Sequence, residues 1–187
     1  MLWTIGIALG IAVLNLGLNY NSLVKLENTV EVAWSQIEVQ LKRRHNLIPN
    51  LVKTTKEYMD YEQQVLTEVA EARSKAVKAR NVAQQAEAES ELNQSLDKLI
   101  GVIEDYPELK ANQSFLDLQE ELVSTENRIA FGRQSYNDAV LYFNNKVEMF
   151  PSNIIASFFD FKTKDYFEVE HERERELPEI DIKKGGI

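Results

Sequence analysis

The sequence contains no cysteine, which excludes a disulfide framework, a thiol nucleophile and a cysteine-ligated zinc site. It has only two histidines, His45 and His171, so there is little material for a histidine-based metal site or catalytic triad. Basic residues are outnumbered, with 21 Lys and Arg against 30 Asp and Glu, and the net charge is -9. A nucleic-acid-binding protein needs a basic face, so this balance argues against nucleic acid as a partner.

Glycine and proline are scarce through most of the 187 residues. Between residues 21 and 150 there are two glycines, Gly101 and Gly132, and two prolines, Pro49 and Pro107. Sheet proteins need many chain reversals rich in these residue types, whereas long helices do not. Glu, Gln, Lys, Leu and Ala are abundant and are strong helix formers, so the sequence predicts an all-α protein of one domain with an anchor.

The chain does have a long apolar run at its start. Residues 1–20 (MLWTIGIALGIAVLNLGLNY) contain no Asp, Glu, Lys or Arg. About 20 helical residues span about 30 Å, the thickness of a bilayer core, and Trp3 and Tyr20 lie near the two ends, where aromatic rings favour the interface. The run lacks the basic start and small-residue cleavage site of a signal peptide, which favours an uncleaved single-pass transmembrane anchor.

Two properties of this anchor leave alternatives open. Gly6 and Gly10 form a G-x-x-x-G pair that lets two membrane helices pack closely, although glycine is common in membrane helices in any case. Lys25, and Lys42–Arg44 at the limit of influence, lie on the C-terminal side of the run, and no basic residue precedes it. The positive-inside rule therefore leans toward a domain on the cytoplasmic side of the cell membrane.

Four further segments repeat apolar residues at steps of three or four, the spacing of a core-facing helical stripe. They are residues 22–45, 47–79, 84–106 and 112–149. Because none can bury its stripe alone, residues 21–150 are expected to form an antiparallel up-and-down four-helix bundle with long helices. Gly132 lies on the last stripe, which indicates close approach of a neighbouring helix.

The helix ends follow from the prolines. A reversal is expected at residues 44–49, where Asn46 can cap a new helix and Pro49 is tolerated in its first turn, with a single kinked helix as the alternative. Another end is expected at Tyr106, since the residue before Pro107 avoids helical conformation. The reversals near 45 and 107 then lie at the tip far from the membrane, and the connection near 80–84 and the end near 150 lie close to it.

Residues 151–187 lie beyond the predicted bundle. The stretch 151–161 carries the apolar residues Ile154, Ile155, Phe158, Phe159 and Phe161. It is expected beside the membrane, either capping the bundle core or lying in the bilayer interface. Residues 168–176 (EVEHERERE) are mostly charged and predict a solvated acidic tail.

Two polar groups are candidate interaction sites. Lys42, Arg43, Arg44 and His45 form a basic run at the predicted distal tip. One interpretation is that these residues contact an anion or an acidic partner. The favoured interpretation is that their positive charge interacts with the negative end of the helix dipole at the C-terminus of the first helix. The second group lies on or beside the last stripe and comprises Asn127, Arg128, Arg133, Tyr136 and Asn137. It is expected to form a buried hydrogen-bond network that fixes helix register, with ligand binding as the alternative.

Catalytic and metal-binding signatures are absent from the sequence. There is no phosphate-binding loop, nucleophile elbow or zinc-protease motif. A di-iron bundle needs E-x-x-H motifs on helices, and the single instance, Glu168 to His171, lies in the predicted tail. We therefore predict no catalytic residue, no cofactor and no metal, and the protein is not expected to be an enzyme.

Several ordered motifs resemble the LemA family of bacterial membrane proteins. They are YNSLV at residues 20–24, AWSQI at 33–37, LKRRHNLIPNLV at 41–52, ENRIAF at 126–131 followed by Arg133, Tyr136, Asn137 and Asn144, and FPSNIIA at 150–156. Asn46 stands where the family more often has Asp. The resemblance implies one N-terminal anchor, a short N-terminus outside the cell and a helical bundle, with no established molecular function or catalytic residues.

These observations predict a membrane-anchored helical scaffold or interaction module of unknown molecular function. Its expected partners are the lipid bilayer, through residues 1–20, and an unidentified protein that contacts the last two helices or the distal tip. One alternative is a bundle that binds a small ligand or metal in its core. Another is a homo-oligomeric protein that organises the membrane.

Overall fold

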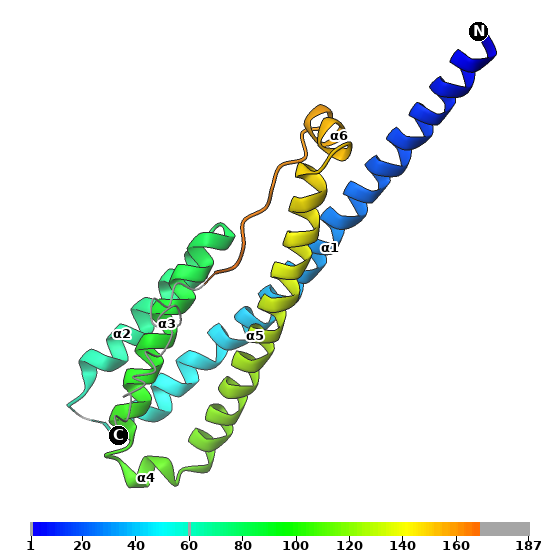
Figure 1. Ribbon diagram of the computed structural model, residues 1–187. Helices are drawn as coiled ribbons and strands as arrows, with labels where there is room; N and C mark the ends of the chain where they lie inside the picture. Colours follow the sequence, from blue (N-terminus) through cyan, green and yellow to red (C-terminus); the bar gives the residue numbers. More distant parts are fainter. Residues whose placement is uncertain (1, 60, 169–187) are drawn as a thin grey trace, which may run out of the picture.

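One very long helix organises the chain, as the computed structural model shows (Figure 1). The structure describes residues 2–59 and 61–168. The helices are α1 (Leu2–Lys56), α2 (Gln63–Lys78), α3 (Val82–Ile103), α4 (Pro107–Lys110), α5 (Gln113–Glu148) and α6 (Ser152–Phe158). The described ranges contain no strand, so the prediction of an all-α protein is confirmed.

The first chain reversal lies later than the sequence predicts. The expected turn at residues 44–49 is wrong, because α1 passes through Pro49 and ends at Lys56. Proline has no N–H to donate to the carbonyl four residues earlier, which belongs to His45. Arg73 of α2 donates its Nε–H to this carbonyl oxygen at 2.6 Å, so a neighbouring helix satisfies the group that proline leaves free. The alternative of a single helix through this region agrees with α1, although α1 ends at Lys56 and does not continue through the predicted 47–79 stripe.

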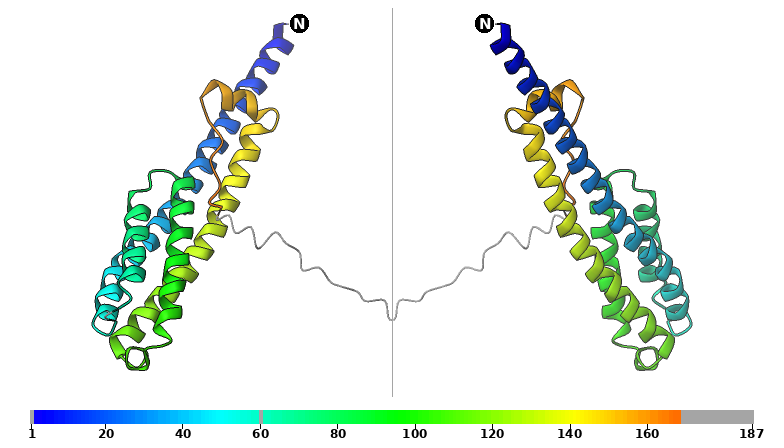
Figure 2. Two further views of the ribbon diagram at one scale, coloured as in Figure 1. Left: turned by 90° about the vertical axis from the view of Figure 1, so that its left-hand side faces the viewer. Right: turned by 90° about the vertical axis from the view of Figure 1, so that its right-hand side faces the viewer.

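Two turns lie at the end of the bundle opposite the N-terminus (Figures 1 and 2), and hydrogen bonds between side chains join them. Asn112 donates from Nδ2 to the Tyr58 hydroxyl at 2.9 Å, and the Tyr106 hydroxyl donates to Glu62 Oε1 at 2.5 Å. Met59, the residue after Tyr58, is buried in the distal core. The reversal near residue 107 therefore lies at the predicted distal tip, and its partner is the turn at 57–62.

The core consists of the predicted stripes. In the half nearer the N-terminus it includes Leu23, Val30, Ile37 and Leu41 of α1 with Ile129, Tyr136, Val140 and Phe143 of α5. In the distal half it includes Ile48, Leu51, Val69, Leu92, Leu99 and Phe115. A Cβ placed on Gly132 would lie 3.0 Å from Cγ1 of Ile37, so the predicted close approach at this glycine is confirmed.

The helices α2 and α3 are shorter than α1 and α5 and cover only the distal part of that pair (Figure 1). The connection at 79–81 therefore does not reach the level of α6, contrary to the expectation for residues 80–84. In the half nearer the N-terminus, α2 and α3 do not cover the α1–α5 pair. There α6 and the extended segment 160–168 complete the core, and Ile155, Ala156 and Phe167 are buried. The capping interpretation of residues 151–161 thus holds for Ile155 and Ala156.

The first third of α1 extends beyond the rest of the molecule (Figures 1 and 2). No helix within the described ranges combines the length and the apolarity of a membrane span. The transmembrane anchor at residues 1–20 stays a prediction. The acidic tail predicted at 168–176 lies, from Val169 onward, outside the described residues.

The α1–α5 interface provides the first test of this core. Ile129 is 6% exposed, and Phe131, two residues later on the same helix, is 73% exposed. Ile129→Asp is expected to abolish cooperative unfolding, because the packing around it offers an aspartate carboxylate no partner. Phe131→Asp should leave helicity and melting temperature nearly unchanged. Circular dichroism of both full-length variants measures the difference, and a native melting curve for Ile129→Asp would contradict the packing described here.

Candidate functional site

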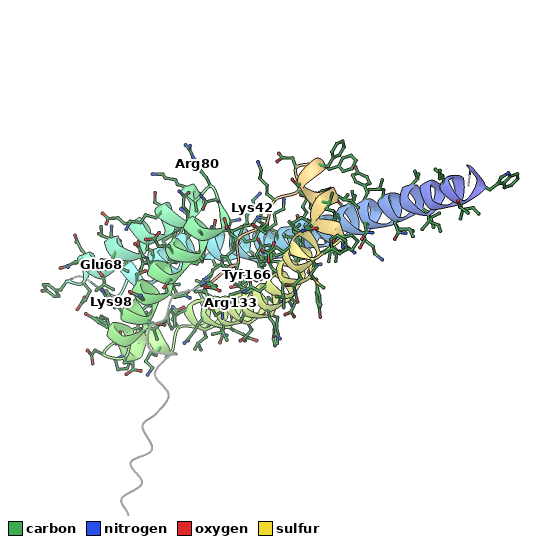
Figure 3. All side chains as sticks on the ribbon, turned by 45° about the horizontal axis from the view of Figure 1, so that its top comes forward. Lys42, Glu68, Arg80, Lys98, Arg133 and Tyr166 are labelled. Atoms are coloured by element: carbon green, nitrogen blue, oxygen red, sulfur yellow. The ribbon has the colours of Figure 1, made fainter. Side chains whose placement is uncertain are left out.

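The basic run Lys42–His45 lies within the bundle and not at its tip, because α1 continues past it to Lys56. Lys42, labelled in Figure 3, and Arg43 are exposed, whereas Arg44 and His45 are only 5% and 7% exposed. The proposed interaction with a helix C-terminus at residue 45 is therefore wrong. Arg43 instead donates from Nε to Glu121 Oε1 of α5 at 2.8 Å, an exposed link between the two longest helices.

Arg44 is the centre of a group of buried and partly buried polar side chains. Its Nη1 lies 2.7 Å from Oε2 of Glu126 on α5 and 3.5 Å from Oε2 of Glu89 on α3. Its Nη2 donates to Oδ1 of Asn93, also on α3. One side chain of α1 thus contacts both α3 and α5.

Glu89 is 3% exposed and has two further partners. Nε2 of His45 lies 2.6 Å from its Oε1, and Gln85 donates from Nε2 to the same oxygen at 2.9 Å. A buried carboxylate is tolerated only when it is paired and hydrogen-bonded in this way. Together Arg44, His45, Glu89, Asn93 and Glu126 form what we call the Arg44 cluster.

The bundle is open on the side between α3 and α5. Helix α1 packs closely with α5 and α2, and α2 packs with α3, but α3 and α5 approach each other far less. In the distal half this opening forms a groove of about 390 Å³, with Arg44 in its wall. Its apolar lining residues are Leu51, Leu96, Ile100, Leu122 and Val123. We call this feature the α3–α5 groove.

Nearer the N-terminus, the segment 160–168 lies along α5 and is held there by two asparagines. Oδ1 of Asn137 accepts from the amide of Phe167 at 2.9 Å, and its Nδ2 donates to the carbonyl of the same residue at 3.2 Å. Asn144 makes the same pair of bonds with Lys164, at 2.9 and 3.0 Å. Each side-chain amide satisfies both backbone groups of one residue, as a neighbouring strand would.

The spacing of the two asparagines matches the segment. Seven helical residues rise about 10.5 Å, and three extended residues span about 10 Å. Asn137 and Asn144 are therefore as far apart as the backbones of Phe167 and Lys164, with the segment antiparallel to α5. This pairing explains why asparagine, a weak helix former, occurs twice on the inner side of a long helix.

Aromatic and charged contacts complete the attachment. Trp34 of α1 packs against the rings of Tyr136 and Phe167, at centroid distances of 5.3 and 5.7 Å. The Tyr136 hydroxyl donates to the carbonyl of Asp165 at 2.9 Å, and Lys164 Nζ lies 2.7 Å from Oε1 of Glu27. The segment thus occupies the place that a longer α3 would take.

The second predicted polar group is divided by the structure. Tyr136 and Asn137 bind segment 160–168, whereas Asn127 and Arg128 are exposed and Arg133 is partly exposed. Sequence reasoning missed Glu89 and Asn93. A signal for Glu89 was present, because it lies three residues before Leu92 on the α3 stripe. In the part of the chain that the structure describes, no three His, Cys, Asp or Glu side chains are grouped to hold a metal ion.

Comparison with known proteins places these features in a family context. A model of the LemA family matches residues 33–182, a range that includes the Arg44 cluster and segment 160–168. Magnetosome protein MamQ 2 of Paramagnetospirillum magneticum is 25% identical over 177 residues, covering 81% of this chain and 65% of the relative. Magnetosome protein MamQ of Magnetospirillum gryphiswaldense is 24% identical over 176 residues, with 80% and 65% covered.

A relative from a different genus is similar over a shorter range. Protein LemA of Metamycoplasma hominis is 27% identical over 144 residues, which covers 75% of this chain and 64% of the relative. The chain therefore spans about two thirds of the length of the curated relatives it matches.

The Arg44 cluster can be tested through its central carboxylate. Glu89→Gln removes the charge that faces Arg44 and His45, and breaking a buried ion pair costs about 3–5 kcal/mol. Urea unfolding followed by circular dichroism should show a loss of this order. Glu87→Gln, an exposed change on the same helix, is the control and should be nearly neutral. Equal stability of the two variants would contradict the role given to Glu89.

Tyr136 gives the attachment of segment 160–168 a dependence on alkaline pH. Burial, reinforced by the Asp165 carboxylate, raises the pKa of Tyr136 from 10.0 to about 12. The folded state therefore favours the neutral phenol of Tyr136. The contribution of this phenol to the free energy of unfolding is complete below pH 10 and is lost as the pH rises toward about 12. Melting temperatures across this range should fall less steeply for Tyr136→Phe. Tyr142→Phe, at a residue that is 64% exposed, should keep the wild-type slope.

Proposed function

The chain belongs to the LemA family, and we propose that it is a membrane-anchored helical scaffold that holds a partner protein close to the bilayer. The observation that carries the proposal is the continuity of α1 from Leu2 to Lys56. Its first third extends away from the bundle, and the same helix then supplies the core and Arg44. A partner bound to the bundle is therefore connected to the bilayer through one unbroken helix.

The proposed single-pass anchor is residues 1–20. Large apolar side chains there are more than half exposed and point in all directions around the helix. They are Trp3, Ile5, Ile7, Ile11, Val13, Leu14, Leu16 and Leu18. A helix that is apolar all round is suited to lipid and not to water. The position of Lys25 on the bundle side supports a cytoplasmic bundle at the cell membrane.

The proposed partner surface is the α3–α5 groove. Grooves between helices bind amphipathic helices or extended peptides through apolar side chains. The adjoining part of the same open side already accommodates an extended segment of this chain, residues 160–168. We therefore propose that an apolar segment of a partner protein occupies the groove, with Leu96 and Leu122 as its main contacts.

The role proposed here is not catalytic. Two of the relatives, Protein LemA and magnetosome protein MamQ 2, have names that state no reaction. The charged side chains of the Arg44 cluster are paired with one another and link three helices, an arrangement suited to stability. The alternative of a metal in the core has no support among the described residues, and a nucleic-acid partner is disfavoured by the net charge of -9.

A homo-oligomeric, membrane-organising protein is the second candidate. It is favoured by Gly6 and Gly10, which have open space where a second helix would lie. The outer face of α5 adds Phe131 and Tyr142, exposed by 73% and 64%. These residues lie on the side of α5 away from the core and are available to a second copy.

The test uses the full-length protein in its own membranes with a photo-crosslinking residue at Val123 of the groove. Val77 on α2 is the matched control, since both valines are 55% exposed. Carbonate-washed membranes should retain the protein, and Val123 alone should crosslink to a defined second protein. Extraction by carbonate would refute the anchor, and equal crosslinking at both positions would refute the groove. Products formed only with other copies of the chain would favour the second candidate.

A further inference from the structure

The short helix α6 has two apolar faces. Ser152, Ile155 and Ala156 point into the molecule and are at most 5% exposed. Ile154 and Phe158 are four residues apart in the helix and therefore share one face, and they are 61% and 81% exposed. Phe150, in the turn between α5 and α6, is 79% exposed. The outward face of this helix is thus as apolar as the buried one.

The exposed face is part of a larger patch. Met149 and Phe159, at the two ends of the turn and helix, are 63% and 51% exposed. Ser152 fixes the patch to the end of α5, because its hydroxyl donates to the carbonyls of Lys146 and Met149 at 2.5 and 2.8 Å. Contiguous exposed apolar surface of this kind marks an interface with a protein or a membrane.

The patch adjoins the proposed anchor. The ring of Phe159 lies 4.7 Å from that of Tyr20, and Phe161 lies 5.9 Å from the same ring. Figure 2 shows α6 beside α1 where the first third of α1 leaves the bundle. Residues 2–20 of a helix are about 28 Å long, which nearly matches the bilayer core of about 30 Å. The boundary of the bilayer then falls at Tyr20, beside α6.

We propose that the outward face of α6, Ile154 and Phe158, inserts into the bilayer interface beside the anchor, together with Phe150 of the preceding turn. The inference rests on the proposed membrane anchoring by residues 1–20. An interfacial segment buries its apolar face about 5–10 Å into the headgroup and acyl boundary. The polar surroundings fit this depth, since Lys162 and Asp160 are strongly exposed next to the helix and pair at 3.3 Å. The bundle then contacts the membrane at two places, a spanning helix and a surface helix.

The two contacts together define the orientation of the bundle. A single spanning helix leaves the bundle free to rotate about the helix axis. Contact through α6 removes that rotation and directs the α3–α5 groove to one side. The inference therefore adds an orienting surface to the proposed scaffold and assigns Phe150, Ile154 and Phe158 to lipid contact.

The test measures depth with nitroxide labels in full-length protein reconstituted into phosphatidylcholine–phosphatidylglycerol vesicles. The natural chain has no cysteine, so single variants are labelled uniquely. Phe158→Cys reports on α6, Leu14→Cys on the anchor and Tyr61→Cys on the distal turn. All three positions are at least 65% exposed, and circular dichroism checks that each variant folds. The measured quantity is the ratio of two collision rates of the label. One is the rate with oxygen, which is enriched in lipid, and the other is the rate with a water-soluble nickel chelate.

The expected result is an oxygen-to-nickel ratio several-fold higher at position 158 than at position 61, and highest at position 14. A lipid-like ratio at 14 with a water-like ratio at 158 would overturn the inference and leave the anchor standing. Water-like ratios at both positions would overturn the anchor itself. Low collision with both reagents at 158 would mean that protein covers α6, which also overturns the inference.

Discussion

The hydrogen bond from Arg73 to the carbonyl oxygen of His45 determines where the bundle begins to fold back. Without a donor at this point, Pro49 would leave the partly buried carbonyl of His45 unpaired inside the helix. With the donor supplied by α2, α1 continues to Lys56 and the reversal moves to residues 57–62. Arg44 and His45 therefore face Glu89 in the middle of the bundle.

The shift of the reversal also explains the uneven helix lengths. Because α1 uses residues up to Lys56, only α2 with 16 residues and α3 with 22 remain to cover an α1–α5 pair that is far longer. The uncovered part of that pair receives α6 and segment 160–168, which bury Ile155 and Phe167. The open side between α3 and α5 is the remaining consequence, since the extended segment fills only the half nearer the N-terminus.

Much of the architecture follows from periodicity alone. Stripes such as Leu92, Leu96 and Leu99 are local patterns, and local patterns predict helices and their buried faces well. The turn at Pro49 was mispredicted because its compensation comes from Arg73, which is remote in sequence. The roles of Asn137 and Asn144 were equally hidden, because their partners are the backbone of a segment with no helical or strand pattern. Arg44 and Tyr136 were predicted as candidate interaction residues, but their partners were not predicted.

The matched spacings of Asn137 and Asn144 have a mechanical consequence for segment 160–168. A slip of one residue would move the segment by about 3.3 Å and turn its side chains to the opposite side. Both asparagine pairs and the buried position of Phe167 would then be lost together. Intermediate positions offer no partial set of bonds. The two asparagine pairs therefore select one register of the segment along α5, the register in which Phe167 is buried.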